Sequence, residues 1–196
     1  MPECRIKNIR FNVFIRLWAI LALCPGGIAQ AADISLALPV KCKLGVSCFI
    51  QNYVDHDPSE NARDFKCGRR TYNGHDGTDI RNRNLEVQRS GVEVLAAAPG
   101  RVTGIRNGME DVSVRVAGKA AIMRKECGNG VVIEHGDGWS TQYCHLAKFS
   151  LVVKQGDFVA ADQQIGLVGL SGDTEFFHLH FTVRHQGNSS IRLLMG

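Results

Sequence analysis

The chain has 196 residues, of which 44% are hydrophobic, and its formal net charge is +4. That length and apolar fraction suit one domain with a real core, with room for an N-terminal extension. Residues 1–31 carry four basic side chains and one acidic side chain, so this segment contributes +3 of the chain's net charge of +4. Without them the chain is close to neutral, which argues against a nucleic-acid partner held by charge.

Residues 1–31 have the pattern of a secretory signal peptide. A basic start precedes the apolar run Phe11–Cys24, and Ala29-Gln30-Ala31 supplies the small residues of a cleavage site. The apolar run is too short and too interrupted for a transmembrane helix. A lipoprotein anchored at Cys24 is disfavoured because Leu23 stands where a small residue is expected. We therefore expect cleavage after Ala31, a periplasmic or secreted protein, and no stable membrane insertion afterwards.

The cysteines agree with export. Five remain after residue 31, and in an oxidising compartment they indicate disulfides with one cysteine left over. No two pairs of them have the spacing of a zinc ribbon. The five are Cys42, Cys48, Cys67, Cys127 and Cys144.

Two cysteines lie just outside the strands of a predicted hairpin whose turn is Gly136-Asp137-Gly138. We expect Cys127 to bond to Cys144, although simple pairing about that turn places Cys144 opposite a residue near Val131. The bond therefore requires Gly128-Asn129-Gly130 to bend the first strand back, which two glycines permit. The next pair is Cys42 with Cys48, leaving Cys67 free, and pairing of Cys67 with either of these stays open.

The remainder divides into an extended arm, residues 32–63, and one domain, residues 64–196. From Arg63 to Asn84 the sequence is polar and rich in turn formers, as in a loop. After Gly91, short apolar strands alternate with turn signals, a pattern that favours an all-β sandwich or barrel. The expected strands are Val92–Ala98, Arg101–Arg106, Ser113–Val116, Ala120–Arg124, Val131–His135, Ser140–His145, Leu151–Val153, Phe158–Ala160, Gln164–Val168 and His178–Arg184.

Two histidines in the last expected strand are spaced for a functional site. Residues two apart in a strand share a face, so His178 and His180 project to one side while Leu179 and Phe181 turn to the core. Paired imidazoles are typical metal ligands, or one ligand beside one proton-transfer group.

An upstream loop supplies matching donors. Two glycines there allow tight turns that aim His75 and Asp79 at one point. With His180 they form a two-imidazole, one-carboxylate set, which leaves a fourth zinc position for a water whose pKa falls to about 7. His178, on the same strand face, and His145, on a neighbouring strand, can then move its proton or stabilise an oxyanion.

At these residues the sequence resembles the lysostaphin-type (LytM-like) zinc metallopeptidases, which cut peptide bonds in bacterial peptidoglycan. The resemblance spans about residues 72–184 in the family's order. Its motifs are His75-x-x-x-Asp79, the run Cys127–His135, Gly138–Leu146, Val153–Asp157, Ile165-Gly166, Ser171-Gly172 and His178-Leu179-His180-Phe181.

The resemblance implies an antiparallel β fold, a sandwich and barrel-like hybrid of the duplicated hybrid motif type, with the site in an open groove. It implies Zn²⁺ held by His75, Asp79 and His180, with His145 and His178 as catalytic histidines. His135 is interpreted as structural and His185 as a solvated strand end. Tyr72 and Arg81 flank the ligand loop and stay unassigned, as substrate contacts or loop caps.

Three features depart from the family pattern. Phe177 stands where proline is common, and Thr182 stands where glutamate is common. The segment Asn188–Gly196 resembles no family ending, which indicates a possible truncation or frame shift.

The leading hypothesis is an exported, monomeric zinc endopeptidase acting on peptidoglycan stem or cross-bridge peptides. One alternative is a non-catalytic relative that binds peptidoglycan or activates an amidase, although such relatives typically lose ligands and all five key positions are present here. Another is a structural, disulfide-bonded β domain with incidental histidines. The sequence names no scissile bond.

Overall fold

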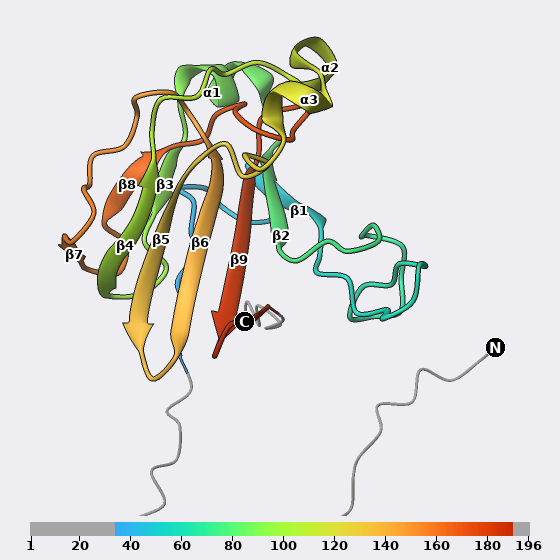
Figure 1. Cartoon of the computed structure of the whole chain (residues 1–196), viewed down its shortest axis with the longest axis horizontal. Coiled ribbons are helices and arrows are strands. Elements are labelled where there is room, and N and C mark those ends of the chain that lie inside the picture. The colour runs from blue at the N-terminus through green and yellow to red at the C-terminus, as the bar shows by residue number, and fades with distance from the viewer. Residues whose placement is uncertain (1–33, 190–196) are drawn as a thin grey trace, which may run out of the picture. The chain divides into compact units, whose positions relative to one another are not determined.

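A computed structural model describes residues 34–189 of the chain. Strands dominate it, and three short helices lie together at one end of the main sheet (Figure 1). The elements are β1 (Cys48–Asn52), β2 (Thr78–Asn82), α1 (Leu85–Ser90), β3 (Glu93–Leu95), β4 (Gly100–Arg106), α2 (Val114–Ala117), α3 (Lys119–Ile122), β5 (Asn129–Gly136), β6 (Trp139–Leu146), β7 (Phe158–Val159), β8 (Gln164–Leu167), β9 (Leu179–His185) and β10 (Asn188–Ser189).

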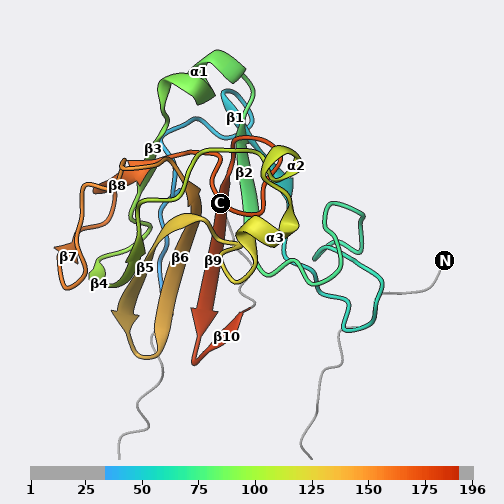
Figure 2. The same ribbon diagram turned by 45° about the horizontal axis from the view of Figure 1, so that its top comes forward.

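The main sheet is antiparallel and open. Its strand order is β1-β2-β9-β6-β5-β4-β7, with β10 paired to β9, and β3 and β8 form a separate two-stranded sheet. The prediction of an antiparallel all-β fold is therefore confirmed, and the sheet does not close into a barrel. Figure 2 shows the long strands β5, β6 and β9 side by side at its centre.

Side chains point alternately to the two sides of each strand, so the main sheet has one face toward the core and one outer face. In β9, Leu179, Phe181 and Val183 are buried in the hydrophobic core, as expected for the residues between and after the two histidines. Val94 of β3 and Ile165 of β8 join the same core cluster. The core thus lies between the two sheets, and the outer face of the main sheet is left for the site.

One row of residues crosses the outer face of the main sheet in register. Asn52 lies opposite Asp79, Asp79 opposite His180, and His180 opposite Cys144. Since directly opposed residues share a face, β1, β2, β9 and β6 present these side chains together. The segment interpreted as an arm thus supplies an edge strand, β1, while the predicted domain boundaries stay predictions.

Two of the expected strands are wrong. The segments predicted at Ser113–Val116 and Ala120–Arg124 contain the helices α2 and α3. Ser113 caps α2 by accepting a hydrogen bond from the Arg115 amide, and Gly118 separates the helices at φ +80°. Four-residue segments rich in valine and alanine carry no decisive periodicity, so the pattern could not separate helix from strand here. The expected strand at Leu151–Val153 is also absent from the described structure.

The structure confirms two disulfides, Cys42–Cys48 and Cys127–Cys144. Cys67 is disulfide-bonded as well. The expectation that Cys67 stays free is therefore wrong.

Within residues 34–189, no helix has the length and apolarity needed to cross a membrane. The predicted signal peptide and its cleavage after Ala31 lie outside the described residues, as does most of the unusual C-terminal segment.

The core face of β9 allows a direct stability test. Leu179 is 0% exposed, and we expect Leu179→Ala to lower the free energy of unfolding by about 2–5 kcal/mol, measured by denaturant titration. The control is Val116→Ala at a side chain that is 80% exposed, where a change within about 0.5 kcal/mol is expected. Equal effects of the two substitutions would contradict this packing.

Candidate metal centre and active site

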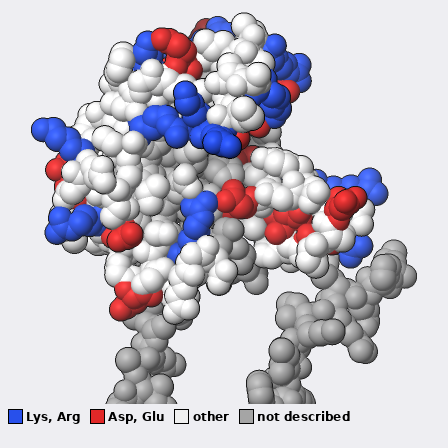
Figure 3. Space-filling model, in the orientation of Figure 1, with Lys and Arg blue, Asp and Glu red and all other residues white. Residues whose placement is uncertain are grey.

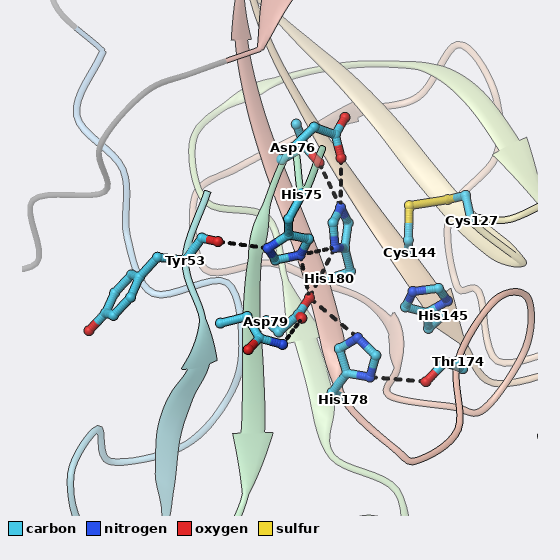
Figure 4. A network of polar contacts seen from close by, with 12 residues as sticks. Tyr53, His75, Asp76, Asp79, Cys127, Cys144, His145, Thr174, His178 and His180 are labelled. Carbon is cyan, nitrogen blue, oxygen red and sulfur yellow. Dashed lines mark hydrogen bonds and ion pairs between the residues drawn. A yellow bond between two sulfur atoms is a disulfide. The ribbon is translucent and has the colours of Figure 1, made fainter. Parts of the chain in front are cut away.

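Three donor atoms meet at one point on the outer face of the sheet (Figure 4). Nε2 of His75 lies 3.1 Å from Oδ1 of Asp79 and 3.1 Å from Nδ1 of His180. The third side of this triangle, from Nδ1 of His180 to Oδ1 of Asp79, is 3.0 Å. All three residues predicted as ligands are therefore brought together, as a group that can hold a metal ion.

The donor set fits zinc. Neighbouring ligands of a tetrahedral zinc ion, bound at about 2.0–2.2 Å, are about 3.3 Å apart. The three sides of the observed triangle are within a few tenths of an ångström of that value. Two imidazoles with one carboxylate leave a fourth position open, which is the composition of catalytic rather than structural zinc sites.

The segment before the ligand loop orients His75 and Asp79. Nδ1 of His75 donates to the Tyr53 carbonyl oxygen at 2.7 Å, which leaves Nε2 as the free donor atom. The amide of Asn52 donates to Oδ2 of Asp79 at 2.8 Å, so Oδ1 faces the triangle. Asp55 accepts a hydrogen bond from the Gly74 amide at 3.0 Å and thereby ties down the loop.

Asp76 and Thr182 orient the third donor, His180. Nε2 of His180 lies 3.2 Å from Oδ1 of Asp76 and 3.1 Å from the Thr182 hydroxyl, so Nδ1 is left for the triangle. Arg184 in turn donates to Oδ2 of Asp76 at 2.9 Å. Gly77 is required by close approach, because a Cβ there would lie 2.6 Å from Nε2 of His180.

Buried charge is balanced within this cluster. Burial alone would raise the pKa of Asp79, but hydrogen bonds from three imidazoles outweigh it and hold that pKa well below its ordinary value. Burial opposes the charged form of His180, yet hydrogen bonds to Asp76 and Asp79 prevail and raise its pKa to about 9. Asp79 is thus a carboxylate at neutral pH, and a metal ion held by Nδ1 of His180 would require that nitrogen to be unprotonated.

His178 lies beside the triangle with an oxygen at each ring nitrogen. Its Nε2 is 3.3 Å from Oδ1 of Asp79. Its Nδ1 is 3.0 Å from the Phe176 carbonyl oxygen and 3.1 Å from the Thr174 hydroxyl. Because a carbonyl oxygen can only accept, Nδ1 of His178 donates to the Phe176 carbonyl, and Nε2 points toward the Asp79 carboxylate.

His145 has a different environment, created by a β-bulge. Between the pairs Val131↔Tyr143 and Asn129↔Leu146, strand β6 has one more residue than β5. His145 occupies the bulge with φ +63°, a left-handed conformation that histidine tolerates better than most residues. The extra residue is thus on the second strand, which corrects the expectation of a bend at Gly128-Asn129-Gly130.

The bulge aims the His145 ring at the other histidines. The ring centroid lies 4.8 Å from that of His178 and 5.9 Å from that of His180. Nδ1 donates to the Ser171 carbonyl oxygen at 2.8 Å, so Nε2 is the unprotonated nitrogen. Burial, followed by the charges of the neighbouring histidines, lowers the pKa of His145 well below its ordinary value. His145 is therefore neutral at neutral pH.

A pocket of about 250 Å³ opens over the triangle. His75, His145 and His180 line this pocket. Three carboxylates line it as well: Asp76, Glu126 and Asp173. Tyr72 lines its edge and stacks on His75 with ring centroids 4.4 Å apart. Figure 3 shows the hollowed surface near the centre of this face, with acidic and basic side chains around it.

Other residues singled out in the sequence lie apart from the triangle. The Arg81 guanidinium lies over the Phe176 ring, 4.6 Å from its centroid, and does not line the pocket. His135 bridges the Pro99 carbonyl and the Thr141 hydroxyl, in agreement with a structural role. His185 stacks on Trp139 at the end of β9.

Sequence reasoning assigned no role to several residues that orient the site. Asn52 and Tyr53 lie in the supposed arm, and Asp76 is one of the three unassigned positions inside the motif His75-x-x-x-Asp79. An acidic residue next to a predicted metal ligand is a usable signal, since ligand histidines commonly donate to carboxylates. A backbone carbonyl such as that of Tyr53 has no such signal.

The profile of peptidase family M23 matches residues 73–191. This range includes the three candidate ligands and the two further site histidines: His75, Asp79, His180, His145 and His178. The chain belongs to this family. Its relatives include a peptidoglycan DD-endopeptidase, ShyB of Vibrio cholerae serotype O1, which is 43% identical over 68 residues. That alignment covers 34% of this chain and 16% of ShyB.

A second M23 relative aligns over a longer stretch. Outer membrane antigenic lipoprotein B of Histophilus somni is 34% identical over 117 residues, covering 59% of this chain and 29% of the relative. The chain thus spans less than a third of the length of either relative. Among solved structures, SpoIIQ in complex with SpoIIIAH has a TM-score of 0.55 at 22% identity, covering 79% of this chain and 95% of that one. This likeness shows the shared M23 fold.

The contact between Asp76 and His180 predicts an effect on metal affinity. We expect Asp76→Asn to weaken zinc binding by about 10–100-fold, because the amide accepts the His180 proton less strongly than the carboxylate. Competition with a chromophoric chelator measures it. The control is Asp162→Asn in an exposed turn, which should bind zinc like the wild type. Unchanged affinity in Asp76→Asn would exclude this orienting role.

The Cys127–Cys144 bond adjoins the bulge that aims His145, and its removal should separate fold from activity. We expect the double variant Cys127→Ser/Cys144→Ser to retain zinc, to lose about 3 kcal/mol of stability, and to hydrolyse peptidoglycan more slowly. Zinc content, denaturant titration and digestion rate are measured together. The double variant Cys42→Ser/Cys48→Ser removes the other bond and should retain the rate. Equal rates in both variants would show that the bond near His145 has no special role.

Proposed function

We propose that the protein is an exported, zinc-dependent endopeptidase that hydrolyses peptide bonds in the stem or cross-bridge peptides of peptidoglycan. The observation that carries this proposal is the triangle of His75, Asp79 and His180, with two further imidazoles beside its open side. Membership of the M23 family and the similarity to a peptidoglycan DD-endopeptidase support the substrate class.

His75, Asp79 and His180 would hold the zinc ion. When bound, zinc supplies Lewis-acid chemistry, which acidifies a water and polarises a carbonyl oxygen. The protein's own contribution to the metal site is to fix the three donor atoms through Tyr53, Asn52 and Asp76.

His145 is suited to act as the general base. Its Nδ1 proton is committed to the Ser171 carbonyl, so Nε2 can accept a proton from water in the pocket. Its lowered pKa keeps this nitrogen free at neutral pH.

His178 is suited to donate a proton or to stabilise negative charge on the carbonyl oxygen. Its Nδ1 donates to the Phe176 carbonyl oxygen, and its Nε2 points toward Asp79 and the triangle. The rings of His145 and His178 lie side by side, with centroids 4.8 Å apart, so two separate imidazoles adjoin the triangle. A hydrolysis needs two such groups, since one takes a proton while the other gives one.

The proposal also includes the partner, the location and the oligomeric state expected from the sequence. Peptidoglycan peptides are the partner, the location is the periplasm or the exterior, and the working form is a monomer. The non-catalytic alternative gains no support from the geometry, because all five side chains are present and converge.

The digestion of purified peptidoglycan tests the catalytic roles. We expect His145→Ala and His178→Ala each to retain zinc and the fold but to lose about 10²–10⁴-fold in hydrolysis rate, the usual contribution of general acid–base groups. The products are separated by chromatography and identified by mass. His56→Ala, at an exposed loop histidine, is the matched control and should digest normally. Near-normal rates in either site variant would remove that residue from the mechanism.

Metal analysis tests the ligand assignment independently of activity. We expect one zinc per wild-type chain and loss of that zinc from His180→Ala after dialysis against a chelator, because the triangle then lacks one of three donors. The control is His56→Ala at an exposed loop histidine, which should retain zinc. Stoichiometric zinc in His180→Ala would show that the ion binds elsewhere.

A further inference from the structure

A second pocket adjoins the one over the triangle. Its volume is about 170 Å³, and it shares Cys127 and Gln142 with the first pocket. Three glycines line it, so much of its wall is backbone without side chains: Gly104, Gly128 and Gly130. The two pockets therefore adjoin at Cys127 and Gln142, and the name groove covers both of them.

Arg106 is the cationic side chain of this groove. It lines the second pocket, and among the residues that line either pocket it is the one lysine or arginine. The first pocket is lined by acidic residues instead. The groove thus has a negative end at the metal site and a positive end at Arg106.

Much of the Arg106 guanidinium is available to a ligand. The side chain is exposed, and Nη1 donates to the Gly128 carbonyl oxygen at 3.0 Å, which anchors it at the pocket. Among the described residues Arg106 has no carboxylate within 4.0 Å, although its charge helps to lower the pKa of Glu126, which lines the first pocket. A guanidinium has five N–H donors in a fixed fork that matches a carboxylate, so a two-pronged contact is open to it.

The register places Arg106 in the same row as the metal ligands. Arg106 lies opposite Gly130, Gly130 faces the bulge at Cys144, and Cys144 lies opposite His180. Arg106 is thus three strands from His180, about 14 Å at the usual strand spacing. An extended peptide advances about 3.3 Å per residue, so this distance corresponds to about four residues.

We propose that Arg106 binds a free carboxylate of the substrate peptide, within about four residues of the bond that is cut. This inference rests on the proposed function, since it assigns a specificity contact to the same groove. The peptide lies across the strands from the metal site to the second pocket and passes over the Cys127–Cys144 bond. A peptide whose carboxylate is replaced by an amide loses the charge-assisted contact.

The test uses cross-linked peptide dimers prepared from peptidoglycan, and the same dimers after carbodiimide coupling to ammonia, which converts free carboxylates to amides. We expect the wild-type protein to prefer the untreated dimers by about tenfold in kcat/KM, as for a charge-assisted hydrogen bond. Arg106→Gln should lose this preference through slower cleavage of the untreated dimers alone. Arg101→Gln is the matched control on the same strand, because Arg101 donates to the Gly156 carbonyl and lines neither pocket.

Binding of the same two probes to the zinc-loaded His145→Ala variant, with and without Arg106→Gln, is measured by calorimetry and keeps the test independent of turnover. Equal affinity for untreated and amidated dimers, or a preference that survives in Arg106→Gln, overturns the assignment of Arg106. A preference in binding that Arg106→Gln abolishes, without any cleavage by the wild type, supports the Arg106 contact and contradicts the proposed hydrolysis instead.

Discussion

The register of β2, β9 and β6 is the constraint on which the site depends. Asp79 lies opposite His180, and His180 lies opposite Cys144, next to the bulged His145. A slip of one residue would turn His180 inward and bring Leu179 or Phe181 to the surface. The core therefore enforces the register, and the register assembles donors that are 101 residues apart in the sequence.

Each functional side chain is held by a second contact directed away from the triangle. Tyr53 fixes His75, Asn52 fixes Asp79, Asp76 fixes His180, and Ser171 fixes His145. These contacts choose which ring nitrogen is free, and so they decide whether an imidazole can bind metal or accept a proton. The neighbouring imidazoles of His75, His178 and His180 stabilise the charge of Asp79, a carboxylate that is only 3% exposed. Rigid positioning of this kind is what a catalytic metal site requires.

Local pattern was sufficient where the chemistry is local. The spacing of His178 and His180 predicts one shared face, and the loop glycines predict how His75 can approach Asp79. The local sequence pattern was insufficient where residues far apart in the sequence decide the structure. The polar strand Thr78–Asn82 looked like a loop because its pairing with β1 and β9 is not encoded in its own composition. Asp76 was assigned no role because its partner Arg184 lies 108 residues away.

The X-ray absorption spectrum of the zinc-loaded protein tests the central claim most directly, because it reports the atoms bound to the metal. The account predicts two imidazole nitrogens and oxygen ligands at about 2.0–2.2 Å, with no sulfur in the coordination sphere. A sulfur shell at about 2.3 Å, or scattering from a number of imidazoles other than two, would contradict it.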